Sequence, residues 1–414
     1  MAVLKTKKSI FVTLLGTAIE HYDAMLITLS TVYFLPNFYG ETSLNNTKII
    51  NLLFFSIALL GKPIGGIIFG LWGDKEGRKL PLSYSIIIMS LCSFLFSLTP
   101  TYNQIGIWSL LILVICRLLQ GFSIGAETSG AITYIYEGLD SKNRYFTSSF
   151  IGFFSYLGGV AAMLVMILAY KNISEVYFWR IAFMFGGIVA LFGFYMRFSL
   201  KESPLFIKKN NYPIKNIFNN KIKIITGALI VGCARVPFYI MTVYMNNIYK
   251  IDFKLPTMKL MQINIFIMLS WSFLFLIFGK ICDKINPQKI FTTSLIFIAI
   301  FSYPFIYYIN KKVEFFNLIT VNFLFSIPCV GFCVPSIILL NRLFYTSCRY
   351  TSIALSYGIG SSLIGGLFPL ISGILVQKTS IKEIPSFLIV FLFLSLLFVF
   401  KVRSGPGLVD QKAA

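Results

Sequence analysis

The sequence predicts an all-α membrane protein with twelve transmembrane helices in two six-helix halves. Of its 414 residues, 57% are hydrophobic and only 12% are charged, whereas a soluble protein has about 25% charged residues. Long apolar runs recur from one end of the chain to the other. This composition excludes a soluble enzyme, a disordered protein and a soluble nucleic-acid-binding protein.

Twelve apolar runs are long enough to form these helices, because a helix needs about 20 residues to cross a bilayer core about 30 Å thick. The runs lie near residues 9–36, 49–72, 80–99, 105–137, 146–170, 177–198, 222–249, 260–281, 290–309, 314–341, 349–376 and 384–402. Lys5, Lys7 and Lys8 precede the first run. That run is longer than the apolar part of a signal peptide and lacks a small-residue cleavage site, so we expect a retained first helix.

Polar segments set the organisation and the orientation. We predict an N-terminal half over 1–200, a cytoplasmic linker over 201–221, a C-terminal half over 222–403 and a cytoplasmic tail over 404–414. With both termini in the cytoplasm, the inner segments hold more than twice as many Lys and Arg residues as the outer ones, as the positive-inside rule requires. Topology and attraction to anionic lipid heads then explain the net charge of +21, so nucleic acid is not expected as a partner.

An internal repeat indicates that the two halves are pseudo-symmetric. The motif G-x-x-x-D-K begins at Gly70, at the end of the second run, and again at Gly279, at the end of the eighth. The fifth and eleventh runs are also alike, since both are rich in glycine, which allows close helix approach. Two matching halves with a solute site between them are typical of secondary transporters.

Several motifs resemble those of one transporter family. Residues 70–79 fit G-x-x-x-D-[RK]-x-G-R-[RK], the loop 2–3 signature of the major facilitator superfamily, and RLLQG at 117–121 resembles its R-x-x-Q-G motif. Five further segments resemble the metabolite:proton symporters, which include proline/betaine, α-ketoglutarate, citrate and shikimate transporters. These segments are EHYD at 20–23, KPIGG at 62–66, GAE at 125–127, WR at 179–180 and ESP at 202–204. The chain departs from the usual family pattern at His21, Lys62 and Ala126.

The resemblance implies a major facilitator fold and uptake of a small organic solute by alternating access, coupled to a proton, in a bacterial inner membrane. The expected solute is a zwitterion such as proline or betaine, or a carboxylate metabolite. We expect a monomer that contacts solute and lipid and needs no cofactor, with H⁺ as the coupling ion and Na⁺ as the alternative.

Other functions compete with this interpretation. A sugar or multidrug facilitator of the same fold is the main rival, because the segment at 202–204 also resembles sugar-porter loops. A channel rarely carries the loop 2–3 signature. A membrane enzyme would need a catalytic cluster, and the chain has one His and no such motif.

The resemblance also implies a gating role for Asp74, Arg78 and Lys79. In the superfamily this segment is taken as a latch on the inward-closed state, with the aspartate near the start of span eleven, where the helix dipole favours an anion. The alternative is a solvated charge cluster that follows the positive-inside rule.

Ionisable residues inside the apolar runs are functional candidates, because a charge in a membrane is costly. Glu20 and Asp23 lie on one face of the first helix near the midplane, and Arg117 of the fourth helix reaches the same depth. Two carboxylates on one face in a low dielectric disfavour double ionisation, as a proton carrier requires. We predict that Glu20 or Asp23 exchanges the proton and that Arg117 modulates it; the alternative is a structural ion pair. His21 either joins this path or packs in place of an aromatic ring.

Two more intramembrane residues, Lys62 and Glu127, lie in the inner halves of the second and fourth runs. We predict a pair that latches the cytoplasmic side in one state. The alternative is a snorkelling lysine and a glutamate that is bonded to nearby Ser or Thr side chains.

The seventh run combines a cation with a helix breaker. Pro237 frees a backbone carbonyl and bends the helix, and Arg235 just before it could bind a solute carboxylate bidentately. Aromatic faces could hold a quaternary ammonium, or the same rings could simply pack or face lipid. The aromatic candidates are Tyr22, Tyr239, Tyr244 and Trp271. We predict that Arg235, Tyr22 and Tyr239 bind the solute.

Overall fold

The computed structural model describes residues 2–40, 44–137, 143–173, 177–197, 202, 221–311, 314–344, 348–378 and 383–399. Every regular element within these ranges is a helix. This follows from the sequence, because a helix satisfies its own backbone hydrogen bonds in lipid and an open strand does not.

The first group of helices runs from α1 to α7. Its elements are α1 (Ala2–Phe34), the 3₁₀ turn η1 (Leu35–Phe38), α2 (Leu44–Glu76), α3 (Lys79–Leu98), α4 (Tyr102–Ile105), α5 (Ile107–Glu137), α6 (Arg144–Asn172) and α7 (Phe178–Arg197). Pro63 lies inside α2 without ending it, as neighbouring helices in a membrane bundle allow.

The second group runs from α9 to α16 and is less regular. Its elements are α9 (Lys221–Tyr239), the π-helical η2 (Ile240–Tyr244), α10 (Met245–Asn247), the π-helical η3 (Ile248–Asp252), α11 (Thr257–Lys284), α12 (Pro287–Lys311), α13 (Phe315–Arg342), α14 (Arg349–Ile359), the π-helical η5 (Gly360–Gly366), α15 (Phe368–Lys378) and α16 (Ile384–Val399). The segments from α9 to η3 form one membrane-spanning unit, and those from α14 to α15 form another.

The predicted spans agree with these helices. Eleven helical segments of the described chain have the length and hydropathy needed to cross a membrane, and they match the first eleven predicted runs. The twelfth run corresponds to α16, of which 16 residues are described. The prediction of an all-α membrane protein with twelve spanning helices is therefore confirmed.

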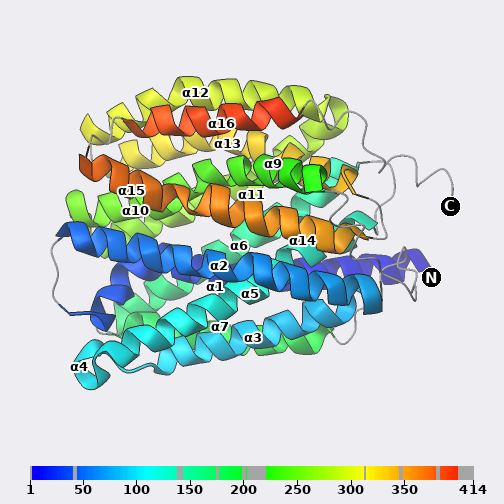
Figure 1. Cartoon of the computed structure of the whole chain (residues 1–414). Coiled ribbons are helices and arrows are strands. Elements are labelled where there is room, and N and C mark those ends of the chain that lie inside the picture. Colours follow the sequence, from blue (N-terminus) through cyan, green and yellow to red (C-terminus); the bar gives the residue numbers. More distant parts are fainter. Residues whose placement is uncertain are drawn as a thin grey trace.

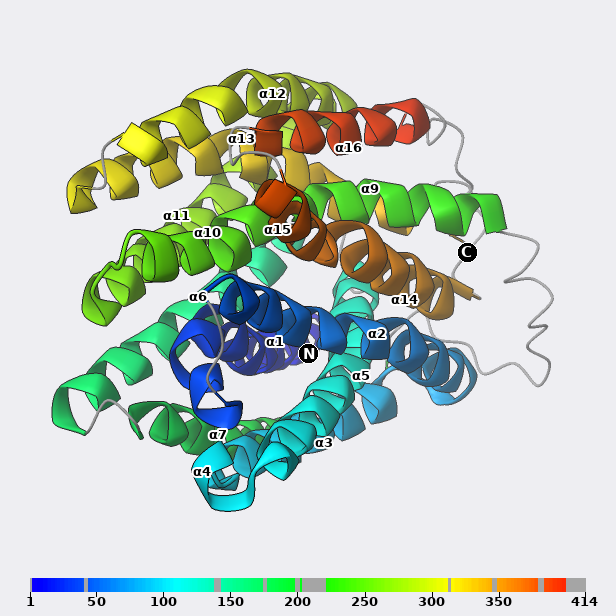
Figure 2. The same cartoon turned by 60° about the vertical axis from the view of Figure 1, so that its left-hand side comes forward.

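The helices form two halves that lie side by side. Figures 1 and 2 show α1 to α7 in one group and α9 to α16 in the other, and α1 begins at the end of the bundle where α16 finishes. Across the boundary, α2 packs on α14 and α6 packs on α11. In each contact the second helix of one half meets the fifth helix of the other, so the two contacts are related by the pseudo-twofold of the fold.

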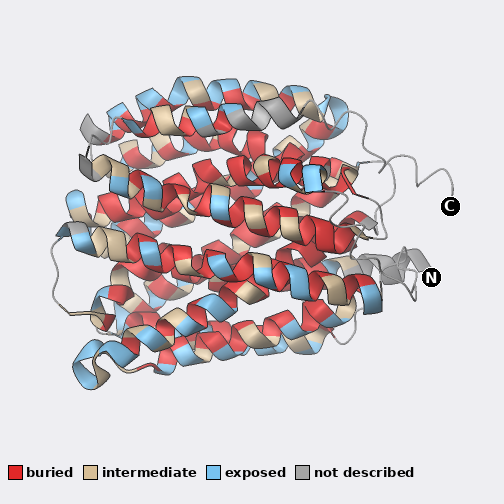
Figure 3. Ribbon diagram, viewed as in Figure 1, coloured by how far each residue is buried: buried red, intermediate tan, exposed pale blue. Residues whose placement is uncertain are grey.

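Burial is distributed as expected for a protein in lipid. Large apolar side chains such as Leu95, Ile115 and Phe301 are exposed, while Ser90 and Ser93 of α3 are buried. Figure 3 shows the buried positions toward the middle of the bundle and the exposed ones on outward faces. A soluble protein keeps such large apolar patches off its surface, whereas lipid tails solvate them.

Two predicted segments fall mostly outside this description. Of the linker 201–221, only Glu202 and Lys221 are described, and the tail 404–414 lies beyond the described residues. The limits of the two halves therefore stay predictions.

Candidate functional site

A cavity of about 50 Å³ lies between the two halves and is called the central cavity here. Helices α1, α2 and α5 line it from the first half, and α9 and α14 line it from the second. Its ionisable and phenolic lining residues are Glu20, His21, Lys62, Arg117, Arg235, Tyr239 and Tyr357. Most intramembrane charges singled out in the sequence therefore meet at one place.

The central cavity carries more positive than negative groups. Lys62, Arg117 and Arg235 line it together with a single carboxylate, Glu20. Within the described chain, none of these three cations forms an ion pair with a carboxylate. Buried charges without a counter-ion are costly, so the cavity favours an anionic group in its ligand.

Arg117 is the clearest case of an unmet charge. It is 3% exposed, and its Nε and Nη1 atoms have no hydrogen-bond partner among the described residues. Its guanidinium lies 6.0 Å from the centre of the Phe55 ring. The predicted pairing of Arg117 with Glu20 or Asp23 is not formed, and the guanidinium instead lines the cavity.

The two carboxylates of α1 have different surroundings. Glu20 lines the cavity, with His21 Nδ1 3.0 Å from its Oε2 atom. Asp23 is 1% exposed and does not line the cavity; its Oδ2 accepts a 2.6 Å hydrogen bond from Ser93 of α3. Three residues turn a helix by about 300°, so the two side chains diverge by about 60°, which is enough to send them to different neighbours.

The predicted aromatic ligands also separate. Tyr239 lines the cavity, with its ring 5.3 Å from that of Phe55 across the boundary between the halves. Tyr22 donates a 2.9 Å hydrogen bond to the carbonyl of Ala182 and does not line the cavity. Its predicted contact with the solute has no support in this geometry, because the hydroxyl points into the first half.

Arg235 is held by two tyrosines that the sequence analysis did not select. Its Nη2 donates to the Tyr357 hydroxyl at 2.5 Å, and its Nη1 donates to the Tyr156 hydroxyl at 3.4 Å. The π-helical η2 begins three residues after Pro237, and π turns are frequent at functional sites. Nothing in the sequence distinguished these two tyrosines from the other buried aromatic residues.

Contacts between the halves close the cavity on both sides. At the end of the bundle where α2 begins, Lys48 pairs with Asp252 at 2.5 Å and Asn51 donates to Asn247 at 3.1 Å. We call the other end, where α2 finishes and α9 begins, the linker end. There the hydroxyl of Tyr350 donates to the carbonyl of Ala126 at 2.9 Å. The two halves therefore contact each other on both sides of the central cavity.

Comparison with known proteins decides the family. Residues 13–354 match the family model described as Major Facilitator Superfamily. The chain belongs to the major facilitator superfamily. This confirms the resemblance carried by the loop 2–3 motif and places the chain among membrane transporters, not enzymes.

Relatives in this superfamily have related names. A protein of Staphylococcus haemolyticus, provisionally named a proline/betaine transporter, is 33% identical over 403 residues, covering 92% of this chain and 84% of the relative. The ectoine/proline transporter ProP of Corynebacterium glutamicum is 27% identical over 413 residues, covering 94% and 82%. The fold is also that of the xylose transporter XylE from E. coli, with a TM-score of 0.78 over 97% of this chain and 98% of that one, at 14% identity. This last likeness shows the fold alone.

The superfamily's loop 2–3 motif lies at the linker end, as expected. Asp74 Oδ2 accepts hydrogen bonds from the backbone nitrogen and hydroxyl of Thr351, at 2.9 and 2.5 Å, in the first turn of α14. Arg78 donates to Asp74 Oδ1 at 2.6 Å and lies 5.5 Å from the centre of the Tyr350 ring. The backbone nitrogen of Lys79 donates to Glu202 at 3.3 Å. The carboxylate of Asp74 thus meets the positive end of a helix dipole.

The second copy of the motif makes the equivalent contact in this facilitator. Asp283 accepts hydrogen bonds from the backbone nitrogens of Tyr145 and Phe146, at 3.0 and 2.9 Å, in the first turn of α6. One turn earlier in each motif, a glycine lets the partner helix approach. A Cβ atom on Gly70 would lie 2.8 Å from Thr351 Cα, and one on Gly279 would lie 3.1 Å from Phe146 Cα. The sequence repeat indicates Asp283, which is not among the gating residues predicted above.

The predicted Lys62–Glu127 pair is not formed in this structure. Glu127 forms a bidentate ion pair with Arg197, the last residue of α7, and also accepts a 3.0 Å hydrogen bond from Ser85. Glu127 and Arg197 are both fully buried. Arg197 lies at the end of the predicted apolar run 177–198, and its distance from Glu127 along the chain gave no signal of contact. Lys62 is left to line the central cavity.

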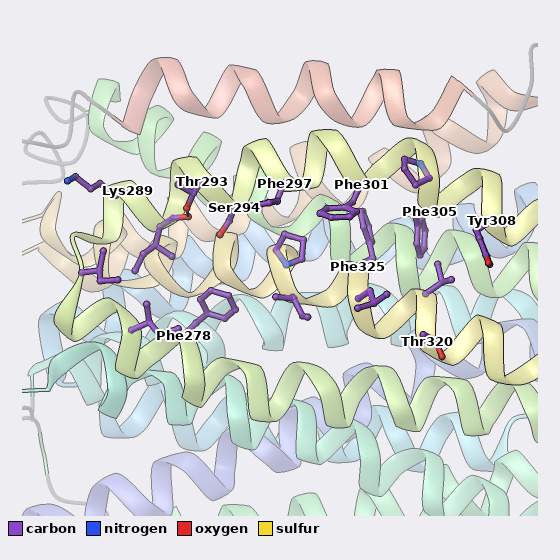
Figure 4. A pocket seen from close by; sticks show the side chains of 18 of the residues that line it. Phe278, Lys289, Thr293, Ser294, Phe297, Phe301, Phe305, Tyr308, Thr320 and Phe325 are labelled. Atoms are coloured by element: carbon purple, nitrogen blue, oxygen red, sulfur yellow. Dashed lines mark hydrogen bonds between the residues drawn. The ribbon is translucent and has the colours of Figure 1, made fainter.

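A much larger cavity, of about 1000 Å³, lies away from the boundary of the two halves. Figure 4 shows it between α11, α12 and α13, with phenylalanine rings along its walls, Lys289 near one end and Tyr308 near the other. Its walls suit lipid chains more than a polar solute. Among the described residues, no three His, Cys, Asp or Glu side chains are grouped to hold a metal ion.

Proposed function

We propose that the chain is a secondary active transporter that takes up a small carboxylate-bearing solute together with a proton by alternating access. The observation that supports this most strongly is Arg117, whose Nε and Nη1 atoms have no hydrogen-bond partner among the described residues, in a cavity between the two halves. A solute carboxylate would supply the missing counter-charge through charge-assisted hydrogen bonds.

The charge pattern favours a zwitterion such as proline or betaine. Arg117, Lys62 and Arg235 can receive the carboxylate, and Glu20 can receive an ammonium. The rings of Phe55 and Tyr239 offer faces to a quaternary ammonium. The relatives' names agree with this class of solute. A sugar, the rival solute, would leave all three cations without a counter-ion.

The coupling ion in this proposal is a proton carried by Glu20 or Asp23. Glu20 lines the cavity, and neither of its oxygens accepts a hydrogen bond from the described residues. A buried carboxylate in such surroundings is stabilised by a proton or by a cation. Arg117 lines the same cavity, and the proposal gives it the role of modulating this proton site. The alternative, Na⁺, would need several oxygen ligands in a cavity that already holds three cations.

The location follows from the same reasoning. The spanning helices are apolar, and the relatives are bacterial proteins. We propose a bacterial plasma membrane, with both termini in the cytoplasm because basic residues are concentrated at the linker end.

Uptake into proteoliposomes tests the function. Proline, betaine, α-ketoglutarate, citrate and shikimate are each offered under an imposed proton gradient, with xylose as the rival. We expect accumulation of one carboxylate-bearing solute and its loss when a protonophore is added. The proposal would be refuted if xylose were the only solute taken up, or if uptake were the same with and without the proton gradient.

Two variants test the proton site. Glu20→Gln should abolish accumulation driven by the proton gradient while sparing counterflow exchange, because exchange needs no net proton movement. Glu314→Gln is the matched control, since Glu314 is exposed and contacts Asn317 three residues along. Asp23→Asn is made in parallel, and normal accumulation in both Glu20→Gln and Asp23→Asn would exclude the pair as the proton carrier.

A further inference from the structure

Arg235 and Tyr357 together separate two cavities. Both residues line the central cavity, and both also line a second, smaller cavity. The hydrogen bond between them is 2.5 Å long, and the guanidinium carbon lies 5.4 Å from the centre of the Tyr357 ring. A solute that passes from one cavity to the other must therefore pass this pair.

The second cavity lies on the linker side of the central one. Its lining includes Ile132, Val231 and Leu340, which lie toward the linker ends of α5, α9 and α13. Beyond it in the same direction lie the contacts of Asp74 with α14 and of Asp283 with α6. The Arg235–Tyr357 pair is thus the first barrier between the solute site and the linker end.

Arg235 also bridges the two halves. Tyr357 is in α14, within the same half as Arg235, whereas Tyr156 is in α6 of the other half. The bond to Tyr156 is long at 3.4 Å, and the bond to Tyr357 is short at 2.5 Å. Tyr357 therefore fixes the orientation in which the guanidinium reaches Tyr156.

A solute carboxylate can compete with the Tyr357 hydroxyl. Both bind the same guanidinium, but a carboxylate is charged and can accept two parallel hydrogen bonds, which makes it the stronger partner. No carboxylate of the described chain forms an ion pair with Arg235. The exchange of partners would turn the guanidinium toward the central cavity and release α6.

We propose that Tyr357 is a positioning residue that sets solute affinity: it holds the Arg235 guanidinium until the solute carboxylate replaces the tyrosine hydroxyl. This inference rests on the proposed function, because it assumes that the solute carries a carboxylate. It adds a link between solute recognition and the opening of the linker side, since the same guanidinium takes part in both.

The variant Tyr357→Phe tests this competition. It keeps the ring under the guanidinium and removes only the hydroxyl. A net hydrogen bond is worth about a two- to tenfold change in affinity, so we expect the half-saturation concentration for the transported carboxylate solute to fall by that factor. The maximal rate should not rise. The empty carrier of this variant lacks the Tyr357 hydroxyl, which brings the Arg235 guanidinium back to Tyr156 after the solute leaves. A merely structural role would lower the maximal rate and leave the half-saturation concentration unchanged.

The measurement is made in proteoliposomes with the five carboxylate solutes named above. Tyr249→Phe is the matched control, because Tyr249 is a buried tyrosine that lines neither cavity and lies in the same spanning unit as Arg235. If proline is the solute, inhibition by prolinamide, which lacks the carboxylate, should be the same in wild type and Tyr357→Phe.

The outcomes separate the two proposals. Transport of a carboxylate solute with an unchanged or raised half-saturation concentration in Tyr357→Phe overturns the role of Tyr357 and leaves the proposed function intact. Transport of none of the five solutes by the wild type overturns the proposed function and this inference with it. A fall in the half-saturation concentration in Tyr357→Phe, with no change in Tyr249→Phe, supports both.

Discussion

Asp74 and Asp283 each bind the first turn of a helix in the opposite half. Asp74, at the end of α2, accepts hydrogen bonds from Thr351 of α14, and Asp283, at the end of α11, accepts them from Tyr145 and Phe146 of α6. A helix N-terminus carries unsatisfied N–H groups and a partial positive charge, which a carboxylate stabilises. The linker end is therefore closed by two carboxylates in equivalent positions, one from each half.

Asp283→Asn should slow transport, but less than Asp74→Asn does. Each change removes a charge from a helix N-terminus. Asp74 is buried, so its loss costs about 1–2 kcal/mol, or about a five- to thirtyfold shift away from the form closed at the linker end. Asp283 is exposed, so its loss costs about 0.3–1 kcal/mol, or about a two- to fivefold shift. We expect a lower maximal uptake rate with little change in half-saturation concentration. Because the two contacts share no partners, the effects should add in the double variant.

Glu76→Gln serves as the control for both aspartates. Glu76 is exposed on the last turn of α2 and accepts a hydrogen bond from Trp72 of its own helix. The Glu76→Gln variant should transport at the wild-type rate. An Asp283→Asn variant with an unchanged maximal rate would show that only the first copy of the motif acts as a latch.

The sequence was sufficient for the fold because a membrane imposes strong local rules. Length and hydropathy located the helices, since each must cross the same apolar thickness. The G-x-x-x-D-K repeat at Gly70 and Gly279 indicated the two halves, because its residues serve a contact that occurs twice. Apolar runs did not reveal the π-helical turns after Pro237, which depend on tertiary packing.

The sequence was less informative about the site because it gives depth in the bilayer but not direction around a helix. Glu20, Lys62, Arg117 and Arg235 were selected as intramembrane charges, and all four line the central cavity. Partners were harder to predict. Lys62 and Glu127 were paired by depth, but Glu127 binds Arg197 at the end of α7.

The Glu127–Arg197 pair should matter for stability. Both side chains are fully buried, and removing one member of a buried pair leaves an uncompensated charge, which costs about 3–5 kcal/mol. Arg197→Leu or Glu127→Leu alone should therefore lower the thermal unfolding temperature in detergent sharply. The double variant should be more stable than either single one, because no charge is left unpaired. Additive losses in the double variant would contradict this account.

Arg117 should control affinity. Hydrogen bonds to a charged group contribute about 1.5–3 kcal/mol, so Arg117→Gln should raise the half-saturation concentration for a carboxylate solute by at least about tenfold. Arg117→Lys keeps the charge and should raise the half-saturation concentration by a smaller factor. Arg180→Gln is the control, because Arg180 donates to the carbonyl of Ser97 and lines no part of the central cavity. Equal half-saturation in Arg117→Gln and wild type would exclude Arg117 from the solute site.

Charge movement should identify the class of solute. If one proton enters with a neutral zwitterion, each cycle moves one positive charge, and a potential of 100 mV supplies about 2.3 kcal/mol. At about 1.4 kcal/mol for each factor of ten, this sustains a solute ratio of about fifty. A monocarboxylate that enters with one proton moves no net charge and responds only to the pH difference. Imposing a potassium diffusion potential at equal pH on both sides separates the two cases. Accumulation of proline or betaine near the fiftyfold ratio is the expected result, and the absence of any response to the potential would exclude one-proton symport of a zwitterion.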